Sequence, residues 1–329
     1  MRVRPLFFPL ALIGAVCVMG GATAHQFSGL IDEHRYPEAE LEVRARLVAD
    51  PRNADALVAA VDLILAQDQE ARLPEAARLA EQCVASNPGS SECQEARANV
   101  LGSQVAHAGL ASALFKGGAI REAYLKAIEL DPQNYRARMA LLRHYLRAPL
   151  LAGGGNGRAR ELASQTGHVN PDASNLMQAF CDADDGKLPD AEALALSPNL
   201  GAAGLLGSQR DLLFALTQKY LNERRYGDSI RVAAELRRRF PMSELGYLAL
   251  GMVAQAQGKH AQALLLFESA LALAPRPLIY YRAGISALAL GERSRAGVAL
   301  EKALAGRPGL ERHQRNDAEQ RLAALSGHT

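Results

Sequence analysis

The sequence predicts an all-α fold, a right-handed solenoid of antiparallel helix pairs that ends in a capping helix. Aromatic residues make up only 5% of the 329 residues and tryptophan is absent, which disfavours a β-sandwich or barrel because strands favour aromatic and β-branched residues. A pattern of small residues, large residues and prolines also recurs every 33 or 34 residues in the last third of the chain. Such a period is typical of helical repeat proteins.

Residues 1–24 have the pattern of a cleaved signal peptide. Met1 to Arg4 form a basic start, Pro5 to Met19 form an apolar run, and Ala22 and Ala24 have the spacing of an A-x-A cleavage site. The apolar run is shorter than the roughly 20 residues that a membrane span needs. We therefore expect cleavage near Ala24 rather than an uncleaved anchor. The mature chain is expected in a periplasm or outside the cell, without a membrane span.

Export changes the interpretation of the cysteines, because disulfides persist in oxidising compartments. Cys17 leaves with the signal peptide. Cys83 and Cys93 lie on the two sides of a predicted tight turn, and this spacing fits either a disulfide or two unpaired thiols in helix packing. Cys181 has no evident partner. The sequence contains no C-x-x-C, so neither a thioredoxin-like site nor a zinc ribbon is indicated.

Residues 25–198 carry weaker and irregular copies of the repeat. In three places an alanine precedes a proline by 12 residues, the spacing that the regular units use. These pairs are Ala39 and Pro51, Ala76 and Pro88, and Ala159 and Pro171. The glycine run Gly153–Gly157 lengthens one turn, and Pro198 cuts one second helix short. The segment 199–208 is then expected to be a loosely packed connection.

Three regular units are predicted over residues 209–308. The middle unit has Gly251, Gly258, Ala263 and Pro275 at its key positions. The unit 33 residues later has Gly284, Gly291, Ala296 and Pro308 at the same positions. The unit 34 residues earlier has Thr217, Arg224, Ser229 and Pro241. The first small residue lets two helices approach closely, and the glycine between the helices supplies backbone freedom that other residues lack. The proline ends the second helix because it has no amide hydrogen.

This pattern resembles the tetratricopeptide repeat. The segment from Leu250 to Pro275 matches the family's L-G-x-x-Y…A-x-x-x-F…P pattern almost position by position, with Leu250-Gly251, Ala263 and Phe267 in corresponding places. The resemblance covers nearly the whole mature chain and is strongest from about 209 to 308. It implies six to eight helical pairs, with the first helix of each pair lining a concave groove.

One further segment is similar to exported bacterial members of that family. Ala148-Pro149 is followed, after three residues, by Gly153-Gly154, and an A-P-x-x-x-G-G segment fills this turn in those proteins. The resemblance implies a protein of the exported bacterial type and carries no activity with it.

Residues 309–329 are predicted to form a capping helix and a tail. Apolar residues recur there at helical intervals, while the residues between them are mostly charged. The apolar set is Leu310, Ala318, Leu322 and Leu325. A helical array needs such a polar end because its last repeat has no neighbour to cover it.

The chain shows no motif for catalysis, metal binding or a cofactor. Gly153–Gly157 lacks the Lys-Ser/Thr that follows the glycines of a phosphate loop. A calcium loop built around Gly186 would place Cys181 and Ala183 where oxygen ligands are required. His25, which would begin the mature chain, has no second histidine at a spacing suited to copper. Neither H-E-x-x-H nor G-x-S-x-G occurs, so we expect no enzyme, no metal and no cofactor.

The charge balance disfavours nucleic acid as a partner. The chain has 37 Lys+Arg and 35 Asp+Glu. Removal of Arg2 and Arg4 with the signal peptide leaves 35 of each sign, whereas phosphate binding requires clustered positive charge. The densest basic run, Arg237 to Arg239, is expected on a solvated face near the end of a helix, where cations interact favourably with the helix dipole.

The remaining candidate site is the groove surface of the three regular units. Its positions are mostly apolar, unlike a clamp for acidic peptide tails, and an exposed apolar patch marks an interaction site. The predicted partner-binding residues are Phe214, Gln218, Leu221, Leu248, Met252, Gln255, Tyr281, Ile285 and Leu288. Two alternatives stay open: the tail helix folds into the groove, or the array curls and buries it.

The sequence thus predicts a non-enzymatic exported scaffold that binds one or more exported or membrane proteins through this groove. A chaperone-like factor for envelope assembly or export, holding an extended client in the same groove, is the alternative. An enzyme with a dispersed site in the irregular N-terminal half is a third hypothesis, which no combination of nucleophile and base supports.

Overall fold

The computed structural model describes residues 27, 29–31, 35–196 and 204–326, and within this part every regular element is helical. The all-α solenoid predicted from the sequence is confirmed. The predicted signal peptide and Pro198 lie outside the described residues, as does the first half of the predicted connection.

Within the described part, the helices form seven consecutive pairs between one leading and one closing helix. The first helices are α3 (Ala54–Ala66), α5 (Ser91–Ala108), α7 (Tyr135–Arg147), α9 (Pro171–Asp184), α11 (Leu206–Asn222), α13 (Leu245–Ala256) and α15 (Pro277–Ala289). The second helices are α4 (Leu73–Ser86), α6 (Leu110–Leu130), α8 (Asn156–Thr166), α10 (Leu188–Ala195), α12 (Tyr226–Arg239), α14 (His260–Leu273) and α16 (Arg293–Ala305). Helix α2 (Tyr36–Ala49) leads, α17 (Arg312–Ser326) closes, and the 3-10 turns η1 (Glu70–Arg72) and η2 (Leu150–Ala152) lie between helices.

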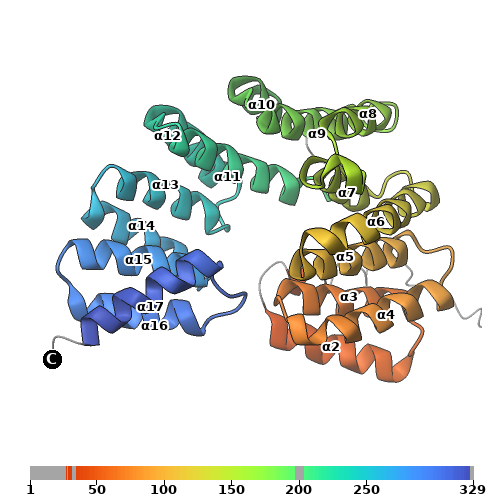
Figure 1. Ribbon diagram of the computed structural model, residues 1–329, viewed down its shortest axis with the longest axis horizontal. Coiled ribbons are helices and arrows are strands. Elements are labelled where there is room, and N and C mark those ends of the chain that lie inside the picture. The colour runs from red at the N-terminus through yellow and green to blue at the C-terminus, as the bar shows by residue number, and fades with distance from the viewer. Residues whose placement is uncertain (1–26, 28, 32–34, 197–203, 327–329) are drawn as a thin grey trace, which may run out of the picture.

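The pairs stack into an arch (Figure 1). Helices α2–α6 form one arm, α13–α17 form the other, and α7–α12 bridge them. Each helix packs against the next along the chain, and each first helix also contacts the first helix of the following pair. In a curved stack, the layer whose members touch lies on the inside of the curve. The first helices α3 to α15 therefore form the inner wall of the arch.

The close approach predicted at the small residues of the repeat is confirmed. A Cβ atom added to Gly251 would lie 2.5 Å from Cε1 of Phe267, and one added to Gly284 would lie 3.0 Å from Cδ2 of Leu300. The first distance is too short for two carbon atoms in contact and the second is at the lower limit, so a side chain at either position would have to push Phe267 or Leu300 aside. Ala263 and its equivalents in the outer layer are fully buried at the crossings. These equivalents are Ala39, Ala76, Ala159 and Ala296.

The turns between paired helices use backbone with positive φ. Gly258 has φ +74° and Gly291 has φ +78°, as the glycine pattern predicts. At the equivalent turn of the first regular unit, Arg224 has φ 58°, and Asp68 has φ 50° in the α3–α4 turn. Residues with a Cβ atom adopt this conformation at a cost in free energy. The positive-φ conformation of the turn is therefore retained at Arg224 and Asp68, where glycine is absent.

Cys83 at the end of α4 and Cys93 at the start of α5 are joined by a disulfide, with their Cα atoms 5.4 Å apart. Both residues are buried and pack with Leu57. The bond joins the outer layer of one pair to the inner wall of the next. Cys181 is a buried free thiol, and its burial raises its pKa to about 11, so it stays protonated at neutral pH.

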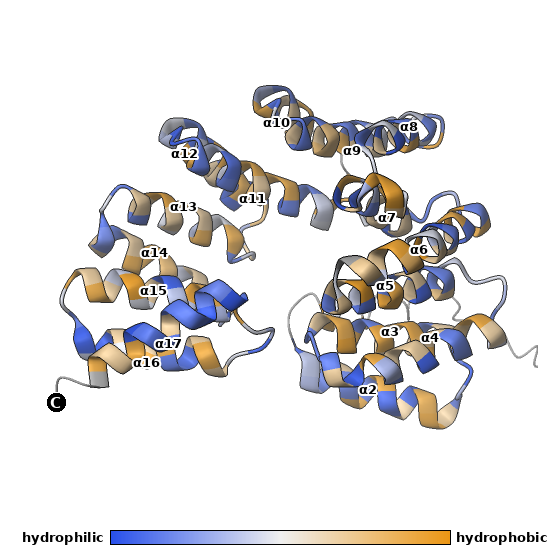
Figure 2. Cartoon of the chain, in the orientation of Figure 1, coloured by the Kyte–Doolittle hydropathy of each residue, from blue (hydrophilic) through white to orange (hydrophobic). Residues whose placement is uncertain are grey.

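Helix α17 closes the C-terminal end. Ala318 is fully buried and Leu310 nearly so, and both pack with Leu300 and Ala303 of α16. The rest of α17 is largely hydrophilic, in contrast to the apolar α13 (Figure 2). This is the arrangement that the predicted capping helix required, because α17 covers the last pair and turns charged side chains to the solvent.

Candidate functional site

The structure buries three residues of the predicted groove. Leu248 is 1% exposed, and Met252 and Tyr281 are each 8% exposed. The expectation that these side chains form an open apolar surface is therefore wrong. Leu248 and Met252 belong to the main hydrophobic core, because the inner-wall helices α11, α13 and α15 pack directly against one another. Whether these residues take part in partner binding stays a prediction.

The tail helix covers the groove of the last regular unit. The hydroxyl of Tyr281 donates a hydrogen bond of 2.8 Å to Oδ2 of Asp317 on α17. Ile285 and Leu288 are partly buried in the same apolar cluster as Leu322 and Leu325 of α17. Of the two alternatives left open by the sequence, occupation of the groove by the tail fits this geometry at α15.

Gln255 is engaged within the inner wall. Its Nε2 donates to the backbone oxygen of Arg282 at 2.9 Å and to Oγ of Ser286 at 2.8 Å. Its Oε1 accepts a hydrogen bond of 3.2 Å from Nη1 of Arg282. Burial lowers the pKa of this arginine. The amide of Gln255 thus fastens α13 to α15, and a partner would have to compete with these bonds.

The α11 residues of the predicted groove are the more accessible ones. Phe214, Gln218 and Leu221 are all half-buried. The two apolar residues pack partly against the main core. Gln218 makes no hydrogen bond with a described residue, so its amide is available to a partner.

Arg143 joins three helices of the inner wall. Its guanidinium lies over the ring of Phe180 on α9, with 5.4 Å from Cζ to the ring centroid. Its Nη2 donates to Oγ of Ser208 at 3.1 Å and lies 3.6 Å from Oδ2 of Asp211, both on α11. Burial lowers the pKa of Arg143, and the neighbouring Arg147 lowers it further, while Asp211 raises it. Positive charge thus gathers where the first arm meets the bridge.

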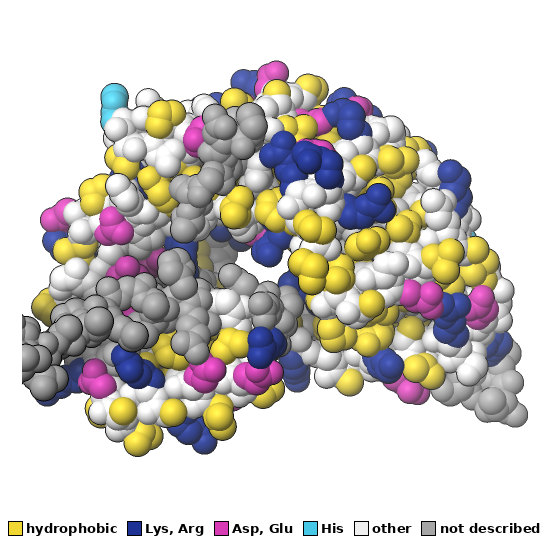
Figure 3. Space-filling model, turned by 180° about the vertical axis from the view of Figure 1, so that it is seen from behind, with side chains coloured by type: hydrophobic (Ala, Val, Ile, Leu, Met, Phe, Trp, Pro, Cys, Tyr) yellow, Lys and Arg dark blue, Asp and Glu magenta, His cyan; other side chains and the backbone are white. Residues whose placement is uncertain are grey.

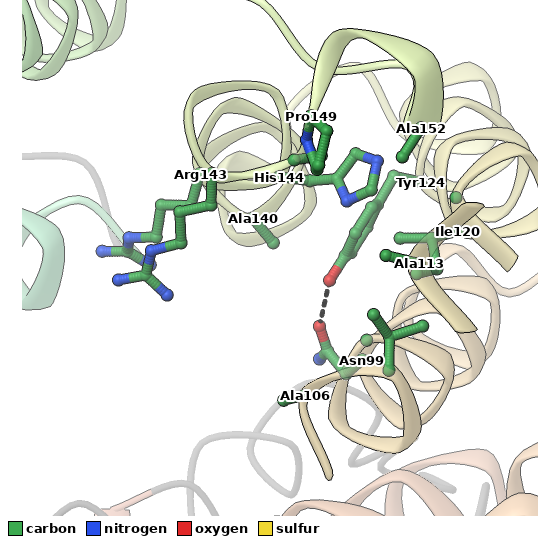
Figure 4. Close-up of a pocket in the computed structure, with 15 residues that line it drawn as sticks. Asn99, Ala106, Ala113, Ile120, Tyr124, Ala140, Arg143, His144, Pro149 and Ala152 are labelled. Carbon is green, nitrogen blue, oxygen red and sulfur yellow. Dashed lines mark hydrogen bonds between the residues drawn. The ribbon is translucent and has the colours of Figure 1, made fainter. Parts of the chain in front are cut away.

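A pocket of about 410 Å³ lies beside this arginine, between α5, α6 and α7. Figure 4 shows Ile120 and Tyr124 of α6 on one side of it, Asn99 of α5 at its base, and Arg143 of α7 across from them. Ala152 of η2 closes one edge. We refer to this feature as the α5–α7 pocket.

The polar groups of the α5–α7 pocket have fixed roles. The hydroxyl of Tyr124 donates to Oδ1 of Asn99 at 2.7 Å, and burial raises the pKa of Tyr124. His144 has its pKa lowered by burial and then by Arg121, so its imidazole is neutral at pH 7. Nε2 of His144 is buried and has no hydrogen-bond partner. This nitrogen is enclosed by the packing around α7 and is not open to the pocket.

The sequence reasoning missed the α5–α7 pocket because its wall is made of residues that usually mark tight helix crossings. Gly102 and Ala106 of α5, with Ala113 and Gly117 of α6, all line it. Added to Gly102, a Cβ would meet no atom within 4 Å, whereas one added to Gly117 would lie 2.4 Å from the backbone oxygen of Ala152. Small residues therefore serve close packing at one end of the pocket and leave space at the other. Sequence spacing does not separate these two uses.

Two aspartates of the segment considered for a calcium loop, Asp182 and Asp185, are engaged in ion pairs. Nη2 of Arg160 lies 2.7 Å from Oδ1 of Asp182 and 2.6 Å from Oδ2 of Asp185. Over the described part of the chain, no three His, Cys, Asp or Glu side chains come together as a metal would require. The basic run near the end of α12 is likewise paired, since Arg238 and Arg239 both bind Glu235 at 2.6 Å.

Comparison with known proteins places the fold. No family model matches the sequence, and no curated protein matches it either. Yeast Tom70 aligns with a TM-score of 0.62 at 10% sequence identity, over 90% of this chain and 60% of the Tom70 chain. The fold is tetratricopeptide-like.

Two further tetratricopeptide structures align less closely. A tetratricopeptide repeat protein from Parabacteroides merdae gives a TM-score of 0.42 at 15% identity, over 92% of this chain and 96% of that one. The Cut9 chain of an APC/C hetero-tetramer gives 0.46 at 13%, over 91% and 54%. The chain thus spans little more than half the length of Cut9 and Tom70. In the described residues, no helix has both the length and the apolar character needed to cross a membrane.

Proposed function

We propose that this protein is an exported, non-enzymatic scaffold that binds an exported or membrane protein through its inner wall. The observation that carries the proposal is the continuous layer of first helices α3 to α15, in which each helix contacts the first helix of the next pair. Seen from behind, the molecule is hollowed between its two arms (Figure 3). A concave surface built from many successive repeats is what solenoid proteins use to bind partners.

Two features support export. The basic start, apolar run and small residues of 1–24 are typical of a signal peptide. The Cys83–Cys93 disulfide suits an oxidising compartment. N-terminal sequencing of the protein from the periplasm or medium should give His25 as the first residue. Recovery of the chain in the cytosol with Met1 retained would contradict export.

The burial of Leu248, Met252 and Tyr281 moves the centre of the proposed binding surface toward α11. Phe214, Gln218 and Leu221 present a half-buried, mixed apolar and polar surface there. Interfaces commonly combine an apolar centre with polar groups that fix orientation.

Partner capture with cross-linking from the native compartment tests the proposal. Gln218→Arg places a bulky cation on the inner wall, where a bound partner would have to desolvate it, and should lower capture at least tenfold. Gln262→Arg is the matched control, because Gln262 is an exposed glutamine on the outer helix α14. One stoichiometric partner supports the scaffold, whereas many substoichiometric clients support the chaperone-like alternative. Equal capture by both variants would contradict binding on the inner wall at α11.

A further inference from the structure

We propose that the α5–α7 pocket binds a small apolar carboxylic acid, with the hydrocarbon body inside and the carboxylate at the arginines of α7. This site is separate from protein binding on the inner wall at α11. The proposal stands on the shape of the pocket and on the charge of the residues that line it.

The size and lining of the pocket suit a small apolar molecule. Its volume of about 410 Å³ falls within the range of ligand sites, roughly 300–1,000 Å³. Val105, Ile120 and several alanines and glycines give it an apolar wall. Figure 4 places Ile120 and Arg143 on opposite sides of the hollow. A molecule with one apolar end and one charged end matches this division.

The charge at the arginine side calls for an anion. No residue that lines the pocket is acidic. Asp211 is shared by two guanidiniums, since it lies 3.6 Å from Arg143 and 3.1 Å from Arg210. Arg147, which lines the pocket and is exposed, forms no ion pair with a described residue. Of the two arginines that line the pocket, Arg143 thus shares its carboxylate with Arg210 and Arg147 has none among the described residues. A ligand carboxylate would supply the missing negative charge with two acceptor oxygens.

Titration calorimetry of the full mature chain with decanoate tests the proposal, using ligand below its critical micelle concentration. Decanoate should bind with one saturable site, decan-1-ol at least tenfold more weakly, and decylammonium not measurably. Arg147→Ala should lower decanoate affinity at least fivefold and leave decan-1-ol affinity unchanged. Gly102→Leu should lower the affinity for both by at least tenfold, because its side chain enters open space inside the pocket.

Gly118→Leu is the matched control. Gly118 is exposed in the interior of α6, and its added Cβ also meets nothing within 4 Å, so this variant should bind decanoate as the parent does. Non-saturable uptake, equal affinity for acid and alcohol, or full decanoate binding by Gly102→Leu would each overturn the proposal. A failed decanoate site leaves the Gln218→Arg experiment on protein capture unaffected, so the two proposals fail separately.

Discussion

The hydroxyl of Tyr281 and Oδ2 of Asp317 are 2.8 Å apart, and this bond fastens the tail helix to the inner wall. The same oxygen accepts a hydrogen bond of 2.6 Å from Nε of Arg321, one turn further along α17. Hydrogen bonding from Arg321, and then from Tyr281, lowers the pKa of Asp317. The tail is thus held by a charged group with two donors as well as by its apolar side.

Charging the buried part of the predicted groove should unfold the C-terminal units rather than act on binding alone. Met252→Glu and Tyr281→Glu each place a carboxylate in packed, water-poor surroundings, and the double variant should lose several kcal/mol of stability. Thermal denaturation followed by circular dichroism measures the loss. Leu265→Glu is the control, since Leu265 is 67% exposed on α14 and its change should leave the melting temperature nearly unaltered. A double variant that melts with the parent would contradict the burial of Met252 and Tyr281.

Replacing Arg224 by glycine should stabilise the protein. Arg224 is exposed and has φ 58°, a conformation that costs a residue with a Cβ roughly 1–2 kcal/mol. The gain should be about 0.5–1 kcal/mol in urea unfolding, after the greater entropy of glycine in the unfolded chain is subtracted. Asn222→Gly, in the last turn of α11, should instead destabilise. Equal effects of the two substitutions would mean that the turn is not left-handed at Arg224.

Adding one methyl group at Gly251 should be costly. The new Cβ would lie 2.5 Å from the ring of the fully buried Phe267, and overpacking of this kind typically costs about 1–3 kcal/mol. Gly227→Ala, near the start of α12, is the matched control because its Cβ would meet nothing within 4 Å, and it should be neutral or stabilising. Chemical denaturation of both variants measures the change in the free energy of unfolding. Equal stability of the two would contradict close packing at the α13–α14 crossing.

The Cys83–Cys93 disulfide should survive purification without reductant and contribute to stability. Peptide mapping should recover the two cysteines as one cross-linked pair, while Cys181 is alkylated only after unfolding. With a sequence separation of 10, the chain-entropy model gives a stabilisation of about 3 kcal/mol. Cys83→Ala with Cys93→Ala should lose an amount of this order, whereas Cys181→Ala should leave the oxidised pair intact. Alkylation of Cys83 and Cys93 in the native, oxidised protein would contradict the bond.

Glu235 should titrate far below an ordinary glutamate. Hydrogen bonding from Arg238, with a further bond from Arg239, lowers its pKa from 4.5 to about 2. A lowered folded-state pKa contributes stability that is present above pH 4.5 and is lost as the pH falls toward 2. NMR titration of the Glu235 carboxyl measures the shift directly, and Arg238→Gln should raise the value. A midpoint near 4.5 in the parent protein would contradict the pairing.

The fold could be predicted because its signals are local. Glycine at the turns, alanine at the crossings and proline after the second helices each act within one helical pair, and the pairs of residues 209–308 follow them closely. The turn at Arg224 shows that residue identity alone does not predict the backbone conformation of a turn. There the neighbouring repeats define the backbone conformation although glycine is missing.

The candidate sites were harder to predict because they depend on packing between distant units. Sequence periodicity placed Met252 and Tyr281 on the groove side of their helices, but not the depth at which α11, α13, α15 and α17 would bury them. The partners of Arg143 come from α9 and α11, well over thirty residues away. The α5–α7 pocket depends on the position of the η2 turn. The glycine run Gly153–Gly157 allows the chain to take this position but does not determine it.

The distribution of contacts along the arch has a consequence for the folding of the chain. The most extensive contacts of each helix are with the next helix or the next but one, so most of the packing forms between neighbouring segments of the chain, and loop closure costs little entropy at each step. Assembly can begin at any pair and proceed outward. A chain delivered end first can therefore consolidate α2 to α7, disulfide included, long before α17 emerges, and the last pairs remain incomplete until their closing helix arrives.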